Sequence, residues 1–153
     1  MPDWINSTAL NTTFNIYLLY PTNRDDEGNF YRLLRNYGNI GIELQAYLID
    51  WEKMDGLPKS YLYVPADHEL FIHRAYKDKL LTKEQITSIN CKIIEECNLL
   101  INFGNGAAVG ENLVSELKYA QQEKIPIYSM PDLSPMAIQS LRLAIKLILK
   151  AEG

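Results

Sequence analysis

The chain has 153 residues, of which 47% are hydrophobic, so it can form one domain with an ordinary core that needs no disulfide or metal. Its formal charge is −4 and its 15 Lys and Arg residues are scattered, which excludes a strongly basic surface, and we expect no nucleic-acid partner. The N-terminus lacks the pattern of a signal peptide, and no run approaches the ~18 apolar residues of a membrane span. These features predict a cytoplasmic protein with no membrane partner.

Neither the cysteines nor the histidines form a metal motif. Cys91 and Cys97 match no zinc or redox spacing, which favours thiols in or beside the core. The run from His68-Glu69 to His73 is one residue longer than the zinc-protease motif, and positions i and i+5 lie about 140° apart on a helix. We therefore expect no metal and no cofactor.

The first part of the chain alternates strand and helix patterns. Residues 1–13 are a polar lead-in to a single domain, residues 14–153, and the apolar run Phe14–Tyr20 before Pro21 predicts a strand. The apolar residues that follow have helical spacing interrupted at Gly38-Asn39, which fits one broken helix or two. A short strand at 61–65 and an irregular or helical segment at 67–79 come next.

The second part continues the alternation. Thr82 and Gln85 form a capping box that starts a helix ending at Glu96. The further elements expected are a strand at 99–103, a helix at about 112–122, a strand at 125–128, and a helix from the Ser134 cap to Lys150. The whole pattern predicts an α/β fold, a doubly wound and mainly parallel sheet of four to five strands with helices on both faces, Rossmann- or flavodoxin-like. Ligands of such folds bind beyond the carboxyl ends of the strands, where the loops share one rim.

The loop after the strand at 99–103 is the strongest candidate for a binding site. Gly104, Gly106 and Gly110 let a ligand approach the backbone, and the helix that begins near Asn112 offers unpaired N–H groups to a sugar or phosphate. A strand-to-helix turn without a ligand would have the same pattern. Glu116 lies beside the buried stripe of this helix, either solvated or directed into a pocket. In a pocket, its carboxylate would act as a nucleophile on a sugar anomeric carbon or would stabilise an oxocarbenium ion.

Four motifs together resemble the nucleoside 2-deoxyribosyltransferase superfamily, which includes deoxynucleoside monophosphate N-glycosidases and small phage-type relatives. The resemblance covers residues 14–129. The motifs are Ile16-Tyr17-Leu18 in the first strand, Asn90 and Asn98 before an apolar strand, Ser115-Glu116-Leu-Lys-Tyr-Ala120, and Lys124-Ile-Pro-Ile-Tyr128.

The resemblance implies cleavage or transfer of an N-glycosidic bond, with Glu116 as the nucleophile and Tyr17 as the hydroxyl that positions it. Asn90 would help to bind the substrate, and Asn90 and Asn98 stand where the family has aspartates, so hydrogen bonding remains but acid–base chemistry is lost. Tyr20 replaces a small glycine and would fill part of the base or sugar pocket. The family also implies a homo-oligomer.

Three functions stay open. The first is an enzyme acting on a small-molecule nucleoside or nucleotide, and the second is a binding module that keeps the pocket without catalysis. The third is an interaction subunit that uses Trp51, Tyr61 and Tyr63 as contact residues, although core packing also explains these side chains. His68 follows a strand end, where it lines the pocket or is an exposed loop residue.

Overall fold

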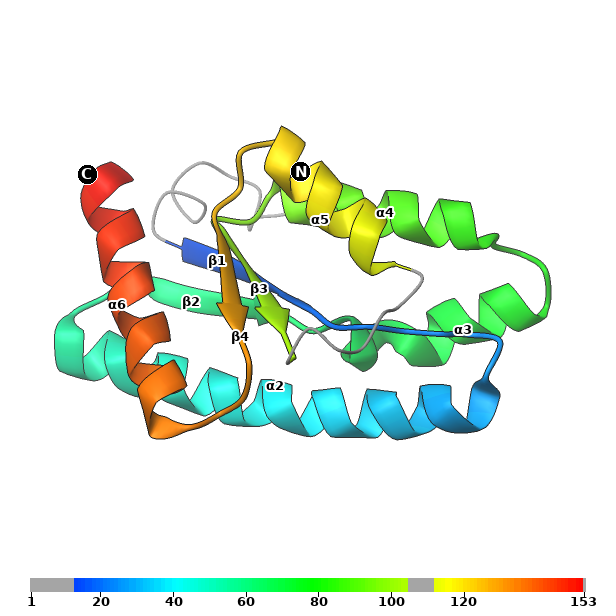
Figure 1. Ribbon diagram of the computed structural model, residues 1–153, viewed down its shortest axis with the longest axis horizontal. Helices are drawn as coiled ribbons and strands as arrows, with labels where there is room; N and C mark the ends of the chain where they lie inside the picture. The colour runs from blue at the N-terminus through cyan, green and yellow to red at the C-terminus, as the bar shows by residue number, and fades with distance from the viewer. Residues whose placement is uncertain (1–12, 105–111, 153) are drawn as a thin grey trace.

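Four parallel strands form the centre of the fold in a computed structural model that describes residues 13–104 and 112–152 (Figure 1). The strands lie in the order β2-β1-β3-β4, so β1 and β3 are central. The elements are β1 (Thr13–Leu19), α2 (Glu27–Asp55), β2 (Lys59–Tyr63), the 3₁₀ segment η2 (Pro65–His68), α3 (Glu69–Lys77), α4 (Lys83–Glu95), β3 (Leu99–Phe103), α5 (Leu113–Gln122), β4 (Ile127–Met130) and α6 (Pro135–Glu152). This confirms the predicted α/β class with helices on both faces of a parallel sheet.

Side chains of β1 alternate between two separate cores. Ile16 and Leu18 point to the face covered by α2 and α6, whereas Tyr17 and Leu19 point to the face covered by α4 and α5 (Figure 1). This alternation follows from the two-residue period of a strand. Tyr17 is therefore the β1 hydroxyl that faces α5, the helix that carries Glu116.

The segment after β1 is one helix and not two. α2 runs through Gly38 and Gly41 without a break, because its buried stripe continues on both sides of them. Gly41 is buried against the loop after β2: a Cβ placed on it would lie 2.7 Å from Val64 Cγ2. Gly41 thus permits a close approach between α2 and the loop after β2, and the break expected at Gly38-Asn39 is absent.

Two other elements differ from their expected bounds. The strand expected at 125–128 lies at Ile127–Met130, because its ladder pairs these four residues with Leu100–Phe103 of β3. The segment at 67–79, predicted as irregular or helical, forms the end of η2 and the regular helix α3. The capping box at Thr82 and Gln85 is confirmed, with both reciprocal hydrogen bonds present.

Asn98 joins β1 to β3 by hydrogen bonds at the amino end of the sheet. Its Oδ1 accepts a hydrogen bond from Asn15 N at 2.8 Å, and its own N–H donates to Asn15 O at 2.7 Å. Asn98 thus extends the pairing of β1 with β3 by one residue, at the end of the strands opposite to the rim that was expected to bind ligands. A structural role accounts for this asparagine.

No helix in the two described ranges is long and apolar enough to cross a lipid bilayer.

The two glycines of α2 provide a matched test of this packing. We expect Gly41→Ala to lower the free energy of unfolding by ~1–3 kcal/mol, because its methyl group would collide with Val64. Gly38→Ala is the control: nothing lies within 4 Å of its Cβ position, so the substitution should stabilise the protein by ~0.5–1 kcal/mol. Urea unfolding measures both, and equal effects would contradict a close approach at Gly41.

Candidate functional site

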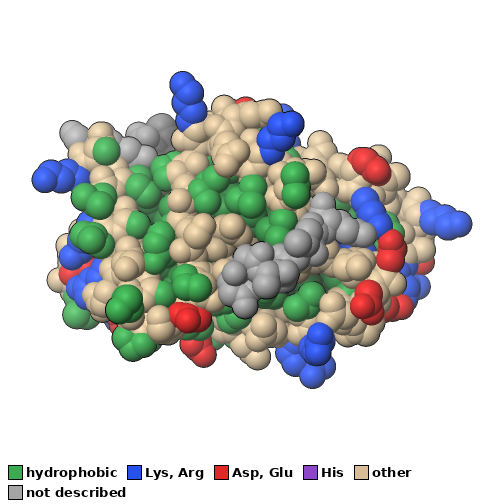
Figure 2. Space-filling view, viewed as in Figure 1, with side chains coloured by type: hydrophobic (Ala, Val, Ile, Leu, Met, Phe, Trp, Pro, Cys, Tyr) green, Lys and Arg blue, Asp and Glu red, His purple; other side chains and the backbone are tan. Residues whose placement is uncertain are grey.

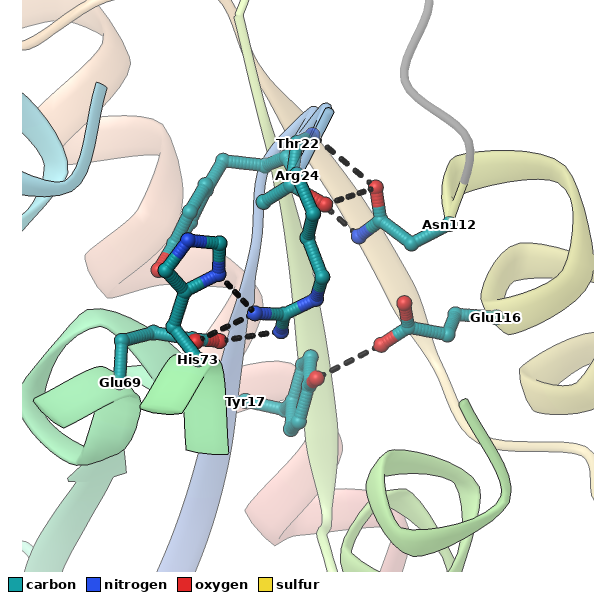
Figure 3. A network of polar contacts seen from close by, with 8 residues as sticks. Tyr17, Thr22, Arg24, Glu69, His73, Asn112 and Glu116 are labelled. Atoms are coloured by element: carbon teal, nitrogen blue, oxygen red, sulfur yellow. Dashed lines mark hydrogen bonds and ion pairs between the residues drawn. The ribbon is translucent and has the colours of Figure 1, made fainter. Parts of the chain in front are cut away.

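Tyr17 and Glu116 meet at the carboxyl side of the sheet. The Tyr17 hydroxyl donates a hydrogen bond of 2.6 Å to Glu116 Oε1, and neither residue is exposed to solvent (Figure 3). The second carboxyl oxygen, Oε2, is buried and accepts no hydrogen bond from the described residues. The structure thus brings together the two residues predicted to be catalytic, and the described residues leave one carboxyl oxygen of Glu116 without a partner.

Burial changes the ionisation of this pair. Removal from water raises the pKa of Glu116 to about 7, although the Tyr17 hydroxyl and the Asn112 side chain act in the opposite direction by favouring the carboxylate. Burial and the negative charge of Glu116 also raise the pKa of Tyr17, which therefore stays a hydrogen-bond donor. A carboxyl group with this pKa exists in both forms near neutral pH, which is a property of many catalytic acids and bases.

Asn112 connects the start of α5 to the end of β1. Its Oδ1 accepts hydrogen bonds from Thr22 N at 3.1 Å and Thr22 Oγ1 at 3.0 Å, and its Nδ2 donates to Tyr20 O at 3.1 Å. These three bonds join segments that lie about ninety residues apart in the sequence. They hold Glu116, one turn further along α5, in register with Tyr17.

A buried ion pair lies beside the Tyr17–Glu116 pair. Arg24, in the loop after β1, donates from Nη1 to Glu69 Oε2 at 2.6 Å and from Nη2 to Glu69 Oε1 at 2.5 Å. Its Nη1 also lies 3.3 Å from His73 Nδ1, and the guanidinium packs over the Phe30 ring. Burial and the Arg24 charge lower the pKa of His73, so its ring is neutral and Nδ1 accepts from Arg24. α3 thus fixes the Arg24 side chain (Figure 3).

Two adjoining cavities border these residues. The outer cleft has a volume of about 380 Å³ and lies between the loop after β1 and the first turns of α4 and α5. The inner cavity has a volume of about 10 Å³. The outer cleft is lined by Thr22, Arg24, Lys83, Glu84, Ile86, Thr87, Asn90, Asn112 and Ser115. The inner cavity is lined by Tyr17, Leu19, Tyr20, Thr22, Arg24, Pro65, Glu69, Asn90 and Asn112.

The other predicted site residues are divided among several places. Asn90 lines both cavities, from α4. Tyr20 borders the inner cavity, but its ring stacks on Tyr37 at 4.2 Å, within the core under α2. Its side chain thus fills the core on the other face and not the space between Tyr17 and Glu116.

Gly104 and His68 line neither of the two cavities. Gly104 has φ of +126°, a conformation that favours glycine, where the chain leaves β3. His68 is exposed and stacks on Tyr63 at 4.9 Å, and it lines neither of the two cavities. The predictions for Gly106 and Gly110 lie outside the described residues.

Arg24, Glu69 and Thr22 border the cavities but belong to no site motif in the sequence. Arg24 and Thr22 lie in the polar loop directly after β1, on the rim where ligands of parallel sheets bind, and this position was the available signal. Glu69 lies in the run from His68 to His73, whose spacing does not fit a zinc site. Its pairing with Arg24 across 45 residues follows no sequence spacing.

The three candidate contact aromatics have different environments. Trp51 is buried in the core under α2, and Tyr63 is partly buried and stacks on Tyr17 with ring centroids 5.5 Å apart. Tyr61 is exposed on β2, with 54% of its surface accessible. Core packing therefore accounts for Trp51, and Tyr63 supports the ring of Tyr17.

In the part of the chain that the structure describes, no group of three His, Cys, Asp or Glu residues could hold a metal ion.

Comparisons with protein-family models, curated proteins and solved structures found no match. The likeness to the nucleoside 2-deoxyribosyltransferase superfamily therefore stays a prediction from the sequence motifs.

The raised pKa of Glu116 predicts a specific pH dependence of stability. Because the folded state binds the proton more tightly than the unfolded chain, the stabilising effect is complete below pH 4.5 and is lost as the pH rises to about 7. The shift corresponds to ~3 kcal/mol. We expect Glu116→Gln to remove this loss, so that the variant gains stability relative to the wild type between pH 5 and pH 8.

Urea unfolding of both proteins at several pH values tests this prediction. His73 is present in both proteins, so its titration cancels in the difference. Parallel stability profiles would show that the pKa of Glu116 is not raised.

Proposed function

We propose that this protein cleaves or transfers the N-glycosidic bond of a nucleoside or nucleotide, with Glu116 as the nucleophile. The observation that carries the proposal is the buried hydrogen bond between Tyr17 and Glu116, in which Oε2 has no partner among residues 13–104 and 112–152. The polar cleft of about 380 Å³ beside this pair provides room for a small ligand. The sequence motifs that resemble deoxyribosyltransferases contain the same two residues.

The reaction follows from the chemistry of a carboxylate at an anomeric carbon. Glu116 Oε2 forms a bond to the anomeric carbon while the bond from this carbon to the nitrogen of the base breaks. The electron pair of the broken bond leaves with the base, which takes a proton from water. Water then attacks the same carbon and yields the free sugar, or a second base attacks it and yields a new nucleoside. Either attack breaks the bond to Glu116 and restores the carboxylate, and the attacking water or base loses a proton to the solvent. The negative charge of Glu116 also stabilises the positive charge that develops on the sugar.

Tyr17 is a positioning residue in this scheme. Its hydroxyl holds Oε1, so the carboxyl group cannot rotate freely and Oε2 keeps one direction. Because the hydrogen bond favours the ionised form of Glu116, it also increases the fraction of nucleophile at neutral pH. Asn112 and Thr22 keep the two elements together.

A second function has its own support. The inner cavity of about 10 Å³ is too small for a sugar ring, and Glu116 lines neither cavity. Asn90, which borders both cavities, has a neutral amide that hydrogen-bonds without transferring a proton. These observations favour a binding module that holds a nucleotide-derived metabolite without turnover. The resemblance implies self-association for either function.

Glu116→Gln tests catalysis. We expect release of base from a panel of nucleosides and nucleoside monophosphates by the wild type, and a loss of at least ~1,000-fold in the variant, because an amide is no nucleophile. Glu123→Gln, an exposed substitution at the end of the same helix, is the matched control and should keep full activity. Chromatography of the released base measures both.

The outcomes separate the two functions. No release above the Glu116→Gln background with any compound would refute the enzyme. In that case, saturable binding of a nucleotide would support the binding module, and no binding would reject it as well.

The pH profile is a further test of Glu116. We expect kcat/KM to rise about tenfold per pH unit below a midpoint near pH 7, because only the ionised carboxylate attacks. Tyr17→Phe should move this acid limb to higher pH, since the variant loses a hydrogen bond that favours the carboxylate. An unchanged limb in Tyr17→Phe would show that the hydrogen bond has no influence on the reacting group.

A further inference from the structure

Both cationic side chains that line the outer cleft are paired with carboxylates. All 15 Lys and Arg residues of the chain lie in the described ranges, and only Arg24 and Lys83 line this cleft. Glu69, which is almost fully buried, holds the Arg24 guanidinium through two hydrogen bonds (Figure 3). Lys83 is therefore the one Lys or Arg besides Arg24 that a negatively charged ligand in the cleft would meet.

Asp25 occupies Lys83 at the edge of the cleft. Asp25 Oδ2 lies 2.5 Å from Lys83 Nζ, and Asp25 Oδ1 accepts a hydrogen bond of 2.7 Å from the Tyr76 hydroxyl. Lys83 and the Tyr76 hydroxyl lower the pKa of Asp25, so its carboxyl group stays ionised. The ion pair joins the loop after β1 to the first residue of α4. A phosphate group that binds Lys83 must therefore take the place of Asp25.

Glu84 adds a third carboxylate to the surroundings of the cleft. It follows Lys83 in the first turn of α4 and lines the cleft directly. Two cations thus face the three carboxylates of Asp25, Glu69 and Glu84, which leaves a net charge of −1. A phosphate monoester carries a charge of about −1.5 to −2 at pH 7, so the charges around the cleft repel it.

The remaining polar groups of the cleft are neutral. They include the hydroxyl groups of Thr87 and Ser115 and the amide of Asn90. Hydroxyl and amide groups both donate and accept hydrogen bonds, so they fit the hydroxyl groups of a sugar and the polar atoms of a base. The cleft of about 380 Å³ therefore suits an uncharged polar ligand.

We propose that Asp25 is a specificity-determining residue: it withholds Lys83 from phosphate groups, so that the protein takes uncharged nucleosides in preference to their 5′-monophosphates. The inference rests on the proposed function for the class of ligand, a nucleoside or nucleotide. It requires no reaction at Glu116, because the charge around the cleft affects binding and turnover alike. Repulsion of the competing ligand is a common means of specificity.

The first measurement needs no variant. It compares kcat/KM of the wild type for a nucleoside and for its 5′-monophosphate, with the same sugar and base. We expect a preference of at least about fivefold for the nucleoside at low ionic strength, and a smaller preference in ~1 M salt, which screens charges. A preference that salt does not reduce would have a cause other than charge and would overturn the inference.

The second measurement uses two variants that each remove one negative charge. Asp25→Asn leaves Lys83 without this carboxylate, so kcat/KM for the monophosphate relative to the nucleoside should rise about threefold or more. Glu27→Gln is the matched control, because Glu27 pairs with Lys77, which does not line the cleft. It should change the ratio by less than about 1.5-fold, and equal effects of the two variants would contradict the role of Asp25.

The results distinguish this inference from the proposed function. Base release that is equal for the two compounds, or faster for the monophosphate, overturns the inference and leaves the enzyme intact. Absence of base release from both contradicts the enzyme. Equilibrium binding of the same two compounds then decides: a nucleoside preference that Asp25→Asn lowers supports the role of Asp25. Equal or tighter binding of the monophosphate, or no binding of either compound, overturns it.

Discussion

The hydrogen bond between Tyr17 and Glu116 is the constraint on which the rest of the site depends. It joins the central strand β1 to helix α5 across 99 residues of sequence, in a place that water does not reach. A buried carboxyl group is costly unless it is protonated or well partnered, and in the described part of the chain one oxygen of Glu116 has a partner and the other does not. The fold therefore maintains an arrangement that packing alone would not favour.

The surroundings of this pair maintain the arrangement. Asn112 connects the first turn of α5 to the end of β1, and Tyr63 supports the ring of Tyr17 by stacking. On the other side, Glu69 and His73 fix Arg24. The site thus lies at the carboxyl ends of the central strands, with rigid secondary structure on each side, as in other parallel α/β folds. A site on such elements holds its geometry more closely than one built from loops.

The exposed hydrophobic side chains of the molecule do not indicate a second functional site. Figure 2 shows apolar side chains over much of one face. Exposed examples on α6 are Met136, Leu143 and Leu147, but scattered exposed apolar residues are common in monomers and indicate no particular partner. The polar cavities beside Tyr17 and Arg24 offer a more specific chemistry.

The sequence by itself determined the α/β class, the parallel sheet and most of its elements, and only its resemblance to the deoxyribosyltransferase superfamily implied that Tyr17 positions Glu116. Hydrophobic periodicity and capping residues are local signals, and the carboxyl ends of parallel strands always lie at one edge of the sheet. Only the tertiary structure decided that α2 continues through Gly38 and Gly41, because the close contact with Val64 is remote in sequence. It also decided that Tyr20 points away from the pair, that Asn98 fastens the opposite end of the sheet, and that Glu69 holds Arg24. Such contacts arise when separate elements pack against one another, and no local pattern encodes them.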